Sequence, residues 1–210
     1  MAKHVYFVRH GESESNVDHV HRRGETQLTD AGRAQAAAVA ERIERIGVDA
    51  LITSPYVRAR DTAAVISARI GLPVEPNELL TEWELPTTAT GLHRDDPAAA
   101  AMRHAIYAAT DDPDYRYEDE ETFTEFSARA AAAIRSLMEH PAERLCVVTH
   151  GGFLRALIGA MLYGGEFTKK DFYAMLRHFA TTNTGITYVR LEDEARGWQL
   201  VSWNDQSHFG

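Results

Sequence analysis

Hydrophobic and polar positions along the chain follow two repeating patterns. Short apolar runs have the length of buried strands, and they fall at residues 4–8, 50–53 and 144–149. Between these runs, Ala and Ile recur at helical spacing over residues 30–46 and 57–70, and each stretch is followed by Gly. Strands that alternate with helices predict a three-layer α/β/α sandwich with a mostly parallel central sheet.

Four further segments extend this pattern. Residues 73–75 resemble a third short strand, and residues 122–139 a further helix. An apolar helix is expected to begin directly after His150-Gly151-Gly152. Near the end of the chain, two apolar stretches predict strands joined by a turn at Arg196-Gly197, and they cover residues 185–192 and 198–203.

The segment from about residue 84 to 121 has a different composition. It contains Pro86, Pro97 and Pro113, an Ala-rich piece, and the acidic run DDPDYRYEDEE. We expect one domain over residues 1–210, in which this segment is a partly helical cap inserted into the core. A solvated loop is the alternative, because acidic runs are usually exposed.

Composition and charge narrow the classes of function. The chain has 210 residues, of which 44% are hydrophobic and 25% charged, as in a globular protein that builds its own core. A net charge of -9 argues against binding nucleic acid through its phosphates. No stretch approaches the roughly 18 apolar residues of a membrane span, and the first residues do not resemble a signal peptide. The single cysteine excludes an intrachain disulfide, so a cytoplasmic location is expected.

Cationic side chains follow three of the predicted strands. Arg9 and His10 come directly after residues 4–8, His150 follows residues 144–149, and Arg58 comes shortly after residues 50–53. Ligands of open α/β sheets bind at the carboxyl ends of the strands, so these side chains are expected to converge. The amides at the start of the helix after His150, including that of Gly151, also favour anions. Guanidinium and imidazole groups together suit a phosphoryl group.

Two other features are weaker. His19 and His21 resemble a metal pair, but no cysteine or carboxylate at suitable spacing supports it, so no metal or cofactor is expected. Cys146 lies inside an apolar strand and is expected to be an inert core residue. Position 152 is Gly rather than Arg, which does not fit the loop of a cysteine-based phosphatase.

The motifs resemble those of a known family. FVRHGESESN is similar to the signature of the histidine phosphatase superfamily, the phosphoglycerate mutase-like proteins. LTDAGRAQA, TSPYVRARDTA, VVTHGGFLR, NTGIT and the terminal WNDQSH are similar to further family segments in the same order, so the resemblance covers most of the chain. It implies the α/β core with an inserted cap that the hydrophobic pattern also predicts.

The resemblance also implies roles for individual residues. His10 would be the nucleophile that becomes phosphorylated, while Arg9, Arg58 and His150 would bind the transferring phosphoryl group and Asn16 would add a neutral donor. We expect Glu12 to orient the histidine or its loop. The loop between Asn16 and Leu28 departs from the family pattern, and its Arg22 and Arg23 would either reach the substrate or be exposed.

A general acid is also needed, because the leaving oxygen must be protonated. The family places this acid in a Leu-x-Glu segment after the third strand, which favours Glu82. Glu84 is two residues on and would point the same way in an extended stretch. An Asp from the cap is a third possibility.

We therefore expect a phosphatase acting on a small phosphorylated substrate, without nucleic acid, membrane or cofactor. Pairing of the terminal strands between two copies would give a homodimer. A phosphoglycerate mutase is the alternative, although a bisphosphorylated intermediate would need more positive charge than the acidic insertion carries. An inactive binding protein on the same fold is a further alternative.

Overall fold

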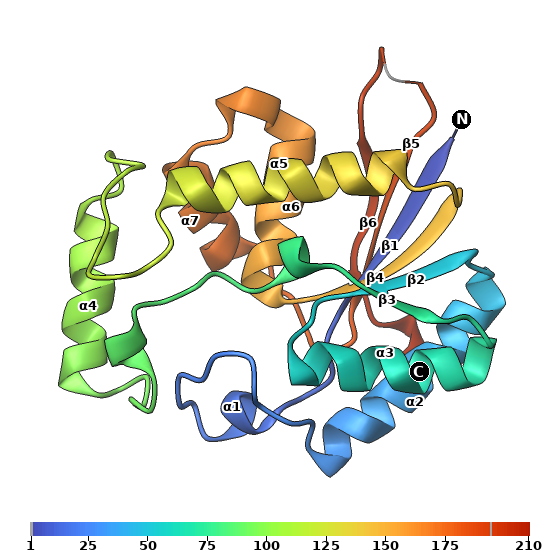
Figure 1. Ribbon diagram of the computed structural model, residues 1–210, viewed down its shortest axis with the longest axis horizontal. Helices are drawn as coiled ribbons and strands as arrows, with labels where there is room; N and C mark the ends of the chain where they lie inside the picture. The colour runs from blue at the N-terminus through green and yellow to red at the C-terminus, as the bar shows by residue number, and fades with distance from the viewer. Residues whose placement is uncertain (1, 194) are drawn as a thin grey trace.

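The computed structural model describes residues 2–193 and 195–210 (Figure 1). Its six-stranded sheet has the order β3-β2-β4-β1-β5-β6. The strands are β1 Lys3–Arg9, β2 Ala50–Thr53, β3 Val74–Pro76, β4 Arg144–Thr149, β5 Ile186–Leu191 and β6 Gln199–Asp205. β3, β2, β4 and β1 are parallel to their neighbours, whereas β5 is antiparallel to β1 and to β6.

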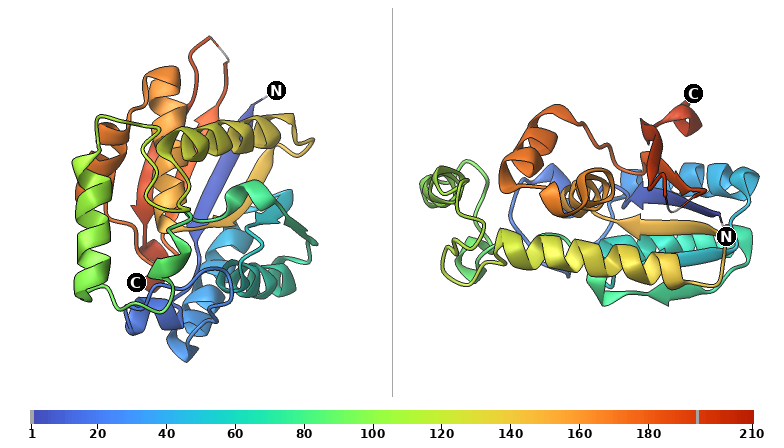
Figure 2. Two further views of the ribbon diagram at one scale, coloured as in Figure 1. Left: turned by 60° about the vertical axis from the view of Figure 1, so that its left-hand side comes forward. Right: turned by 90° about the horizontal axis from the view of Figure 1, so that it is seen from above.

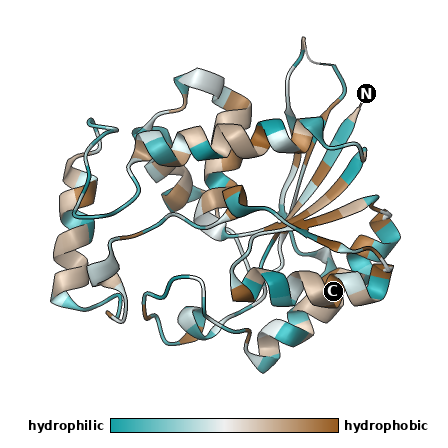
Figure 3. Cartoon of the chain, in the orientation of Figure 1, coloured by the Kyte–Doolittle hydropathy of each residue, from teal (hydrophilic) through white to brown (hydrophobic). Residues whose placement is uncertain are grey.

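Helices cover both faces of this sheet, which confirms the predicted three-layer α/β/α fold (Figure 2). α2 Asp30–Ile46 and α3 Val57–Ile70 pack on one face, and α5 Phe123–Glu139 and α6 Gly151–Tyr163 on the other. The central parallel strands β1, β2 and β4 are buried over most of their length and are mainly apolar, while the covering helices carry polar residues on their outer sides (Figure 3). The remaining α-helices are α1 Glu14–Val17, α4 Pro97–Ala108 and α7 Lys169–His178.

The register between β1 and β4 positions the predicted site. Arg9 is opposite Thr149, so both strands end at the same level of the sheet. His10 and His150 are the residues that follow, and they are therefore neighbours across the sheet edge. β2 also ends at this edge, and α3 begins a few residues later.

The segment at 84–121 leaves the core beside this edge and contains α4. In Figure 1 this helix stands apart from the sheet layers. A small apolar cluster around Ala89, Met102 and Ile106 joins it to Tyr173 of α7. The acidic run after α4 lies mostly in turns and irregular structure. Among the described residues, no helix combines the length and the apolar character needed to cross a bilayer.

Candidate active site

His10 and His150 lie side by side at the carboxyl edge of the sheet. Their ring centroids are 5.2 Å apart, and both side chains are buried. Arg58, in the first turn of α3, donates from Nε to His10 Nε2 at 3.1 Å. The structure thus brings together three of the residues that the sequence predicted for the site.

The hydrogen bonds of His10 define which ring nitrogen is free to react. Its Nδ1 lies 2.7 Å from the carbonyl oxygen of Gly11. A carbonyl only accepts hydrogen bonds, so Nδ1 carries the proton and Nε2 holds a lone pair. Burial, together with the positive charges of Arg58 and Arg9, lowers the pKa of His10 well below the usual value. The ring is therefore neutral, as a nucleophile must be.

The loop after His10 is held tightly. The amide of Gly11 donates to Thr62 Oγ1 at 3.0 Å, and a Cβ at Gly11 would come within 2.6 Å of the carbonyl oxygen of Gly32. The Glu12 carboxylate accepts from Thr29 Oγ1 at 2.7 Å. This contact ties the loop to the start of α2, in keeping with an orienting role for Glu12.

Arg9 and His150 present buried nitrogen atoms without partners. Arg9 Nη1 donates to the carbonyl oxygen of Thr181 at 2.6 Å, and His150 Nε2 lies 2.7 Å from Ser54 Oγ. Within the described part of the chain, Arg9 Nε and His150 Nδ1 are buried and make no hydrogen bond. Burial lowers the pKa of Arg9 to about 10. Buried polar atoms are nearly always paired, so these two indicate a place for a bound anion.

The side chain of Glu82 lies at the N-terminus of α6, beside Gly152. Its carboxylate accepts from the amides of Gly152 and Phe153 at 2.9 and 2.7 Å and from that of Trp83 at 3.1 Å. A Cβ at Gly152 would lie 2.7 Å from Glu82 Oε1, so glycine is required for this contact. Glu84 also lines the pocket, but it is exposed, and its carboxylate is not held by the amides of α6.

Arg9, His10, Arg58 and Glu82 line a pocket of about 450 Å³, and His150 lies behind them, against the ring of His10. Arg22, Arg23 and Arg94 line its outer part, together with Glu84. Arg22 pairs with Asp18 at 2.5 Å, and Arg23 lies 3.7 Å from Asp119. Both arginines thus reach the pocket, but each has a carboxylate partner. No aspartate lines the pocket among the residues that the structure describes.

Asn16 and Gly151 also border the pocket. Asn16 Oδ1 accepts from the amide of Ser13 at 3.1 Å and from Asn183 Nδ2 at 3.2 Å. The side-chain nitrogen of Asn16, Nδ2, is then the group that can donate to a phosphoryl oxygen. A Cβ on Gly151 would lie 3.0 Å from Thr181 Oγ1 and 3.4 Å from Arg9 Nε, so the backbone approaches the arginine closely.

Three residues that the sequence analysis missed also support the site. Asn183 donates to the carbonyl oxygen of His10 at 2.9 Å, and Thr181 supplies the carbonyl that holds Arg9. Arg155 donates to the carbonyl oxygen of Gly151 at 2.7 Å and lines the pocket. The NTGIT segment was a signal for Asn183. Arg155 lies one helical turn after Gly151, so the helix predicted after His150 was a signal that Arg155 is close to Gly151.

Metal binding gains no support from the geometry. The parts of the chain that the structure covers contain no group of three or more His, Cys, Asp or Glu suited to hold a metal ion. His19 faces His93 with ring centroids 6.1 Å apart, rather than pairing with His21. Cys146 is fully buried in β4, and burial raises the pKa of its thiol to about 12.

Fold and site together define an α/β protein with two buried histidines beside an arginine-lined pocket at the carboxyl edge of its sheet. Residues 5–206 match the family model described as histidine phosphatase superfamily (branch 1). The chain belongs to that superfamily, in which chemistry through a phosphohistidine is general.

Known relatives agree with this family. The chain is 29% identical to the probable phosphoglycerate mutase GpmB of Klebsiella pneumoniae subsp. pneumoniae, over 98% of this chain and 94% of that one. The structure of a protein called mycobacterial hydrolase 1 is 25% identical, has a TM-score of 0.80, and aligns over 98% of this chain and 99% of its own. A mycobacterial glucosyl-3-phosphoglycerate phosphatase has the same fold, with a TM-score of 0.80, 24% identity, and coverage of 98% and 100%.

Proposed function

We propose that this protein is a phosphatase that hydrolyses small phosphomonoesters through a phosphohistidine on His10, with Glu82 as general acid and base. One observation supports this above all others. His10 Nε2 carries a lone pair, because the proton is on Nδ1, which donates to the carbonyl oxygen of Gly11. This Nε2 faces Arg58 inside the pocket. Membership of the superfamily supports the same chemistry.

The first step forms the covalent intermediate. The lone pair of His10 Nε2 attacks phosphorus, the bond from phosphorus to the ester oxygen breaks, and Glu82 gives its proton to that oxygen. Arg58 must turn its Nε–H from the imidazole to a phosphoryl oxygen. Arg9 Nε and His150 Nδ1, which have no partner in the described structure, take further oxygens and stabilise the charge in the transition state.

The second step releases phosphate. A water oxygen attacks the phosphohistidine, one water proton passes to the Glu82 carboxylate, and the bond from nitrogen to phosphorus breaks. His10 regains its lone pair and Glu82 is again protonated.

Substitution of the nucleophile tests this function. We expect His10→Ala to lower kcat/KM by about 10⁴-fold or more, because the nucleophile of a covalent mechanism cannot be replaced by its neighbours. The assay measures phosphate release from a broad panel of phosphomonoesters, with acid-labile ³²P in wild-type protein as a second readout. Exposed His104 offers a control, and His104→Ala should keep wild-type activity. Near-normal activity of His10→Ala would show that the mechanism is wrong.

A mutase is the second candidate, because curated relatives are named probable phosphoglycerate mutases. A bisphosphorylated intermediate needs free cations around its second phosphate. Of the arginines that line the outer part of the pocket, Arg22 and Arg23 are already paired with carboxylates, which leaves Arg94 without an ion pair in the described structure. The insertion at 84–121, which we propose acts as a cap, is acidic overall. These features favour the phosphatase. Primer-dependent isomerisation of 3-phosphoglycerate would instead establish the mutase.

The alternative of an inactive binding protein is disfavoured by the site itself. Arg9, His10, Arg58 and Glu82 line one pocket, and His150 packs against His10 behind it. Absence of turnover on the whole panel, together with tight binding of a protein partner, would favour it.

Location and assembly complete the proposal. The buried, unpaired Cys146 is compatible with the reducing cytoplasm, which we take as the location. A homodimer would form through β6, the edge strand of the sheet, where Val201 is exposed. Light scattering of the purified protein distinguishes a dimer from a monomer.

A further inference from the structure

The segment that carries Glu82 lacks regular secondary structure of its own. The 3₁₀ turn Glu78–Leu80 ends just before it, and residues 81–86 are irregular. An irregular segment has few backbone hydrogen bonds to fix its position, yet a general acid must be placed within a fraction of an ångström. The Glu82 carboxyl is fixed by α6, but its backbone needs a separate anchor.

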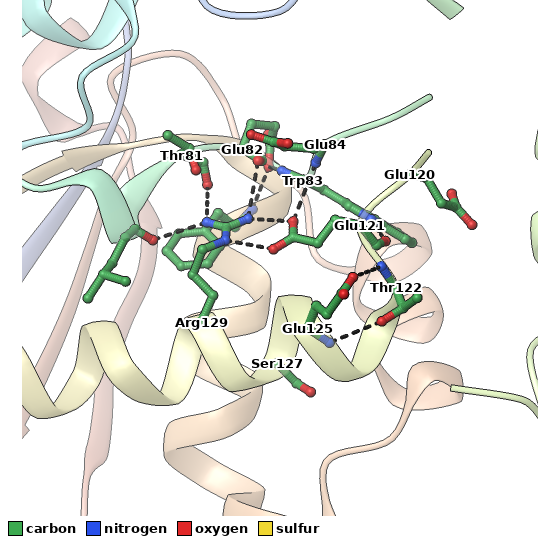
Figure 4. A network of polar contacts seen from close by, with 12 residues as sticks. Thr81, Glu82, Trp83, Glu84, Glu120, Glu121, Thr122, Glu125, Ser127 and Arg129 are labelled. Carbon is green, nitrogen blue, oxygen red and sulfur yellow. Dashed lines mark hydrogen bonds and ion pairs between the residues drawn. The ribbon is translucent and has the colours of Figure 1, made fainter. Parts of the chain in front are cut away.

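Arg129, from the middle of α5, supplies that anchor (Figure 4). Nη1 donates to the carbonyl oxygens of Leu79 and Thr81 at 3.0 and 2.8 Å, and Nη2 donates to that of Glu82 at 3.2 Å. Three carbonyl oxygens of one short segment are thus bound by one side chain.

Glu121 fixes the guanidinium in turn. Arg129 Nε donates to Oε1 and Nη2 to Oε2, both at 2.7 Å. The two side chains are only 15% and 12% exposed, so solvent weakens this pair little. Each of the five N–H groups of the guanidinium then has an acceptor. A lysine has three N–H groups and no planar fork, so it cannot reproduce this arrangement.

The same two residues reach the acid from other directions. The amide of Glu121 donates to the carbonyl oxygen of Glu84 at 2.9 Å, and Trp83 Nε1 donates to the carbonyl oxygen of Glu121 at 2.8 Å. The Arg129 guanidinium lies 4.4 Å from the ring centroid of Phe153, whose amide binds the Glu82 carboxylate. Arg129 therefore contacts both the backbone of the acid and the residue that holds its carboxyl.

We infer that Arg129 and Glu121 form a positioning pair that places Glu82 for proton transfer to the leaving oxygen. The inference rests on the proposed role of Glu82 as general acid. Neither residue lines the pocket, so they act through Glu82 rather than on the substrate. A purely structural pair would instead affect the fold alone.

Dependence of the rate on the leaving group separates these two roles. A misplaced acid matters little for p-nitrophenyl phosphate, whose leaving group departs as a stable anion. It matters greatly for phenyl and alkyl phosphates, whose oxygens need the proton. We expect Arg129→Lys to lower kcat/KM about tenfold or more for alkyl phosphates and less than about twofold for p-nitrophenyl phosphate. The tenfold loss is part of the roughly 10²–10⁴-fold that general acid catalysis contributes.

Three further variants complete the experiment. Arg144→Lys is the matched control, since Arg144 also binds backbone carbonyls and lies over an aromatic ring, but at the opposite end of β4. It should leave every rate unchanged. Glu121→Gln keeps the shape of the pair and should give a milder form of the Arg129→Lys pattern, which covers the case that the lysine variant folds poorly. In Glu82→Gln, the leaving-group effect should be larger, and adding Arg129→Lys should not increase it.

The outcomes distinguish the inference from the proposed function. The positioning pair is overturned if Arg129→Lys and Glu121→Gln lower kcat/KM equally for all leaving groups, or not at all. A steep dependence on the leaving group in Glu82→Gln would still support Glu82 as the general acid. A flat leaving-group effect in Glu82→Gln itself overturns the acid and the positioning pair with it. Additive effects in the double variant also overturn the pair.

Discussion

His10 and His150 are buried neighbours whose hydrogen bonds give them different chemistry. The carbonyl of Gly11 fixes the proton of His10 on Nδ1, which leaves Nε2 as a nucleophile. His150 contacts Ser54 through Nε2, and its Nδ1 is one of the buried atoms that find no partner in the described structure. Burial and the positive charge of Arg58 keep the pKa of both rings well below the usual value. One ring is therefore suited to attack and the other to bind an oxygen.

Arg58 is the residue whose shape matters most beside His10. It contacts the nucleophile through Nε and the carbonyl oxygen of Arg23 through Nη1 at 2.9 Å, so its fork spans two sides of the pocket. Arg58→Lys keeps the charge but loses the fork. We expect kcat/KM to fall by about 10²-fold or more, the typical cost of losing one oriented donor to the transition state. Steady-state assays on one phosphomonoester measure this.

The control for this prediction lies on the same helix. Arg60 is exposed and two residues away, so Arg60→Lys should keep the activity of the wild type. Equal activity of Arg58→Lys and Arg60→Lys would contradict the role of Arg58.

At the scale of elements, the start of α2 packs directly on the loop of the nucleophile. A Cβ at Gly32 would lie only 2.0 Å from the carbonyl oxygen of Glu12. Both partners are backbone, so neither can move without shifting the helix or the loop. We expect Gly32→Ala to reduce the free energy of unfolding by about 1–3 kcal/mol, as overpacking does, and to lower kcat as His10 shifts. Urea denaturation and steady-state rates measure the two effects.

Gly165 provides the matched substitution. No atom lies within 4 Å of a Cβ built there, so Gly165→Ala should leave stability and rate unchanged. A stable, fully active Gly32→Ala protein would show that the packing of α2 on the loop is looser than described.

Hydrophobic patterning predicts the strands and the long helices because each buries one continuous apolar run or stripe. α7 was not predicted, because its sequence KKDFYAMLRH is short and only half apolar, with Phe172 and Met175 as its buried apolar side chains. Glu82 and Glu84 could not be told apart from the sequence, because alternation along the chain gives the two carboxyls the same side. The structure adds one difference between them, the amides of α6 that bind the Glu82 carboxylate, and our proposal of Glu82 as the acid rests on it.

The sequence also could not predict which distant residues hold the site residues in position. Arg129 and Glu121 are eight residues apart and precede the His150 motif. No local pattern connects them with Glu82, because the contact depends on how α5 packs against α6. Arg9, His10, Arg58 and His150 could be located because each lies at the end of a strand with a readable boundary or within a few residues of it.

For the whole molecule, buried histidines make stability depend on pH. The pKa values of His10, His150, His21 and His208 are all lowered, with burial as the largest cause. The unfolded chain binds protons at these rings below about pH 6.5, while the folded protein does not, so stability falls as pH decreases below that value. Glu120, whose pKa is raised by burial, opposes this trend as a single group.

Urea denaturation at pH 7.5, 6.5 and 5.5 measures this dependence. We expect the urea midpoint to decrease between pH 6.5 and 5.5. The free energy of unfolding should fall by about 1 kcal/mol or more, since each ring contributes up to about 1.4 kcal/mol per pH unit. The carboxylates whose pKa values are lowered lose their stabilising charge only at more acidic pH. A constant midpoint over this range would contradict the assignment of these rings as neutral.

Cys146 gives this fold an internal reporter. Cys146 lies on β4, between β1 and β2, and its thiol is buried in the apolar cluster between the sheet and helices α2 and α3. Its raised pKa leaves almost no thiolate at neutral pH. A disulfide reagent such as Ellman's compound reaches it only when the central strands separate. The rate of labelling therefore measures global opening of the sheet directly, while oxidants that inactivate cysteine-dependent phosphatases leave the chemistry of this site intact.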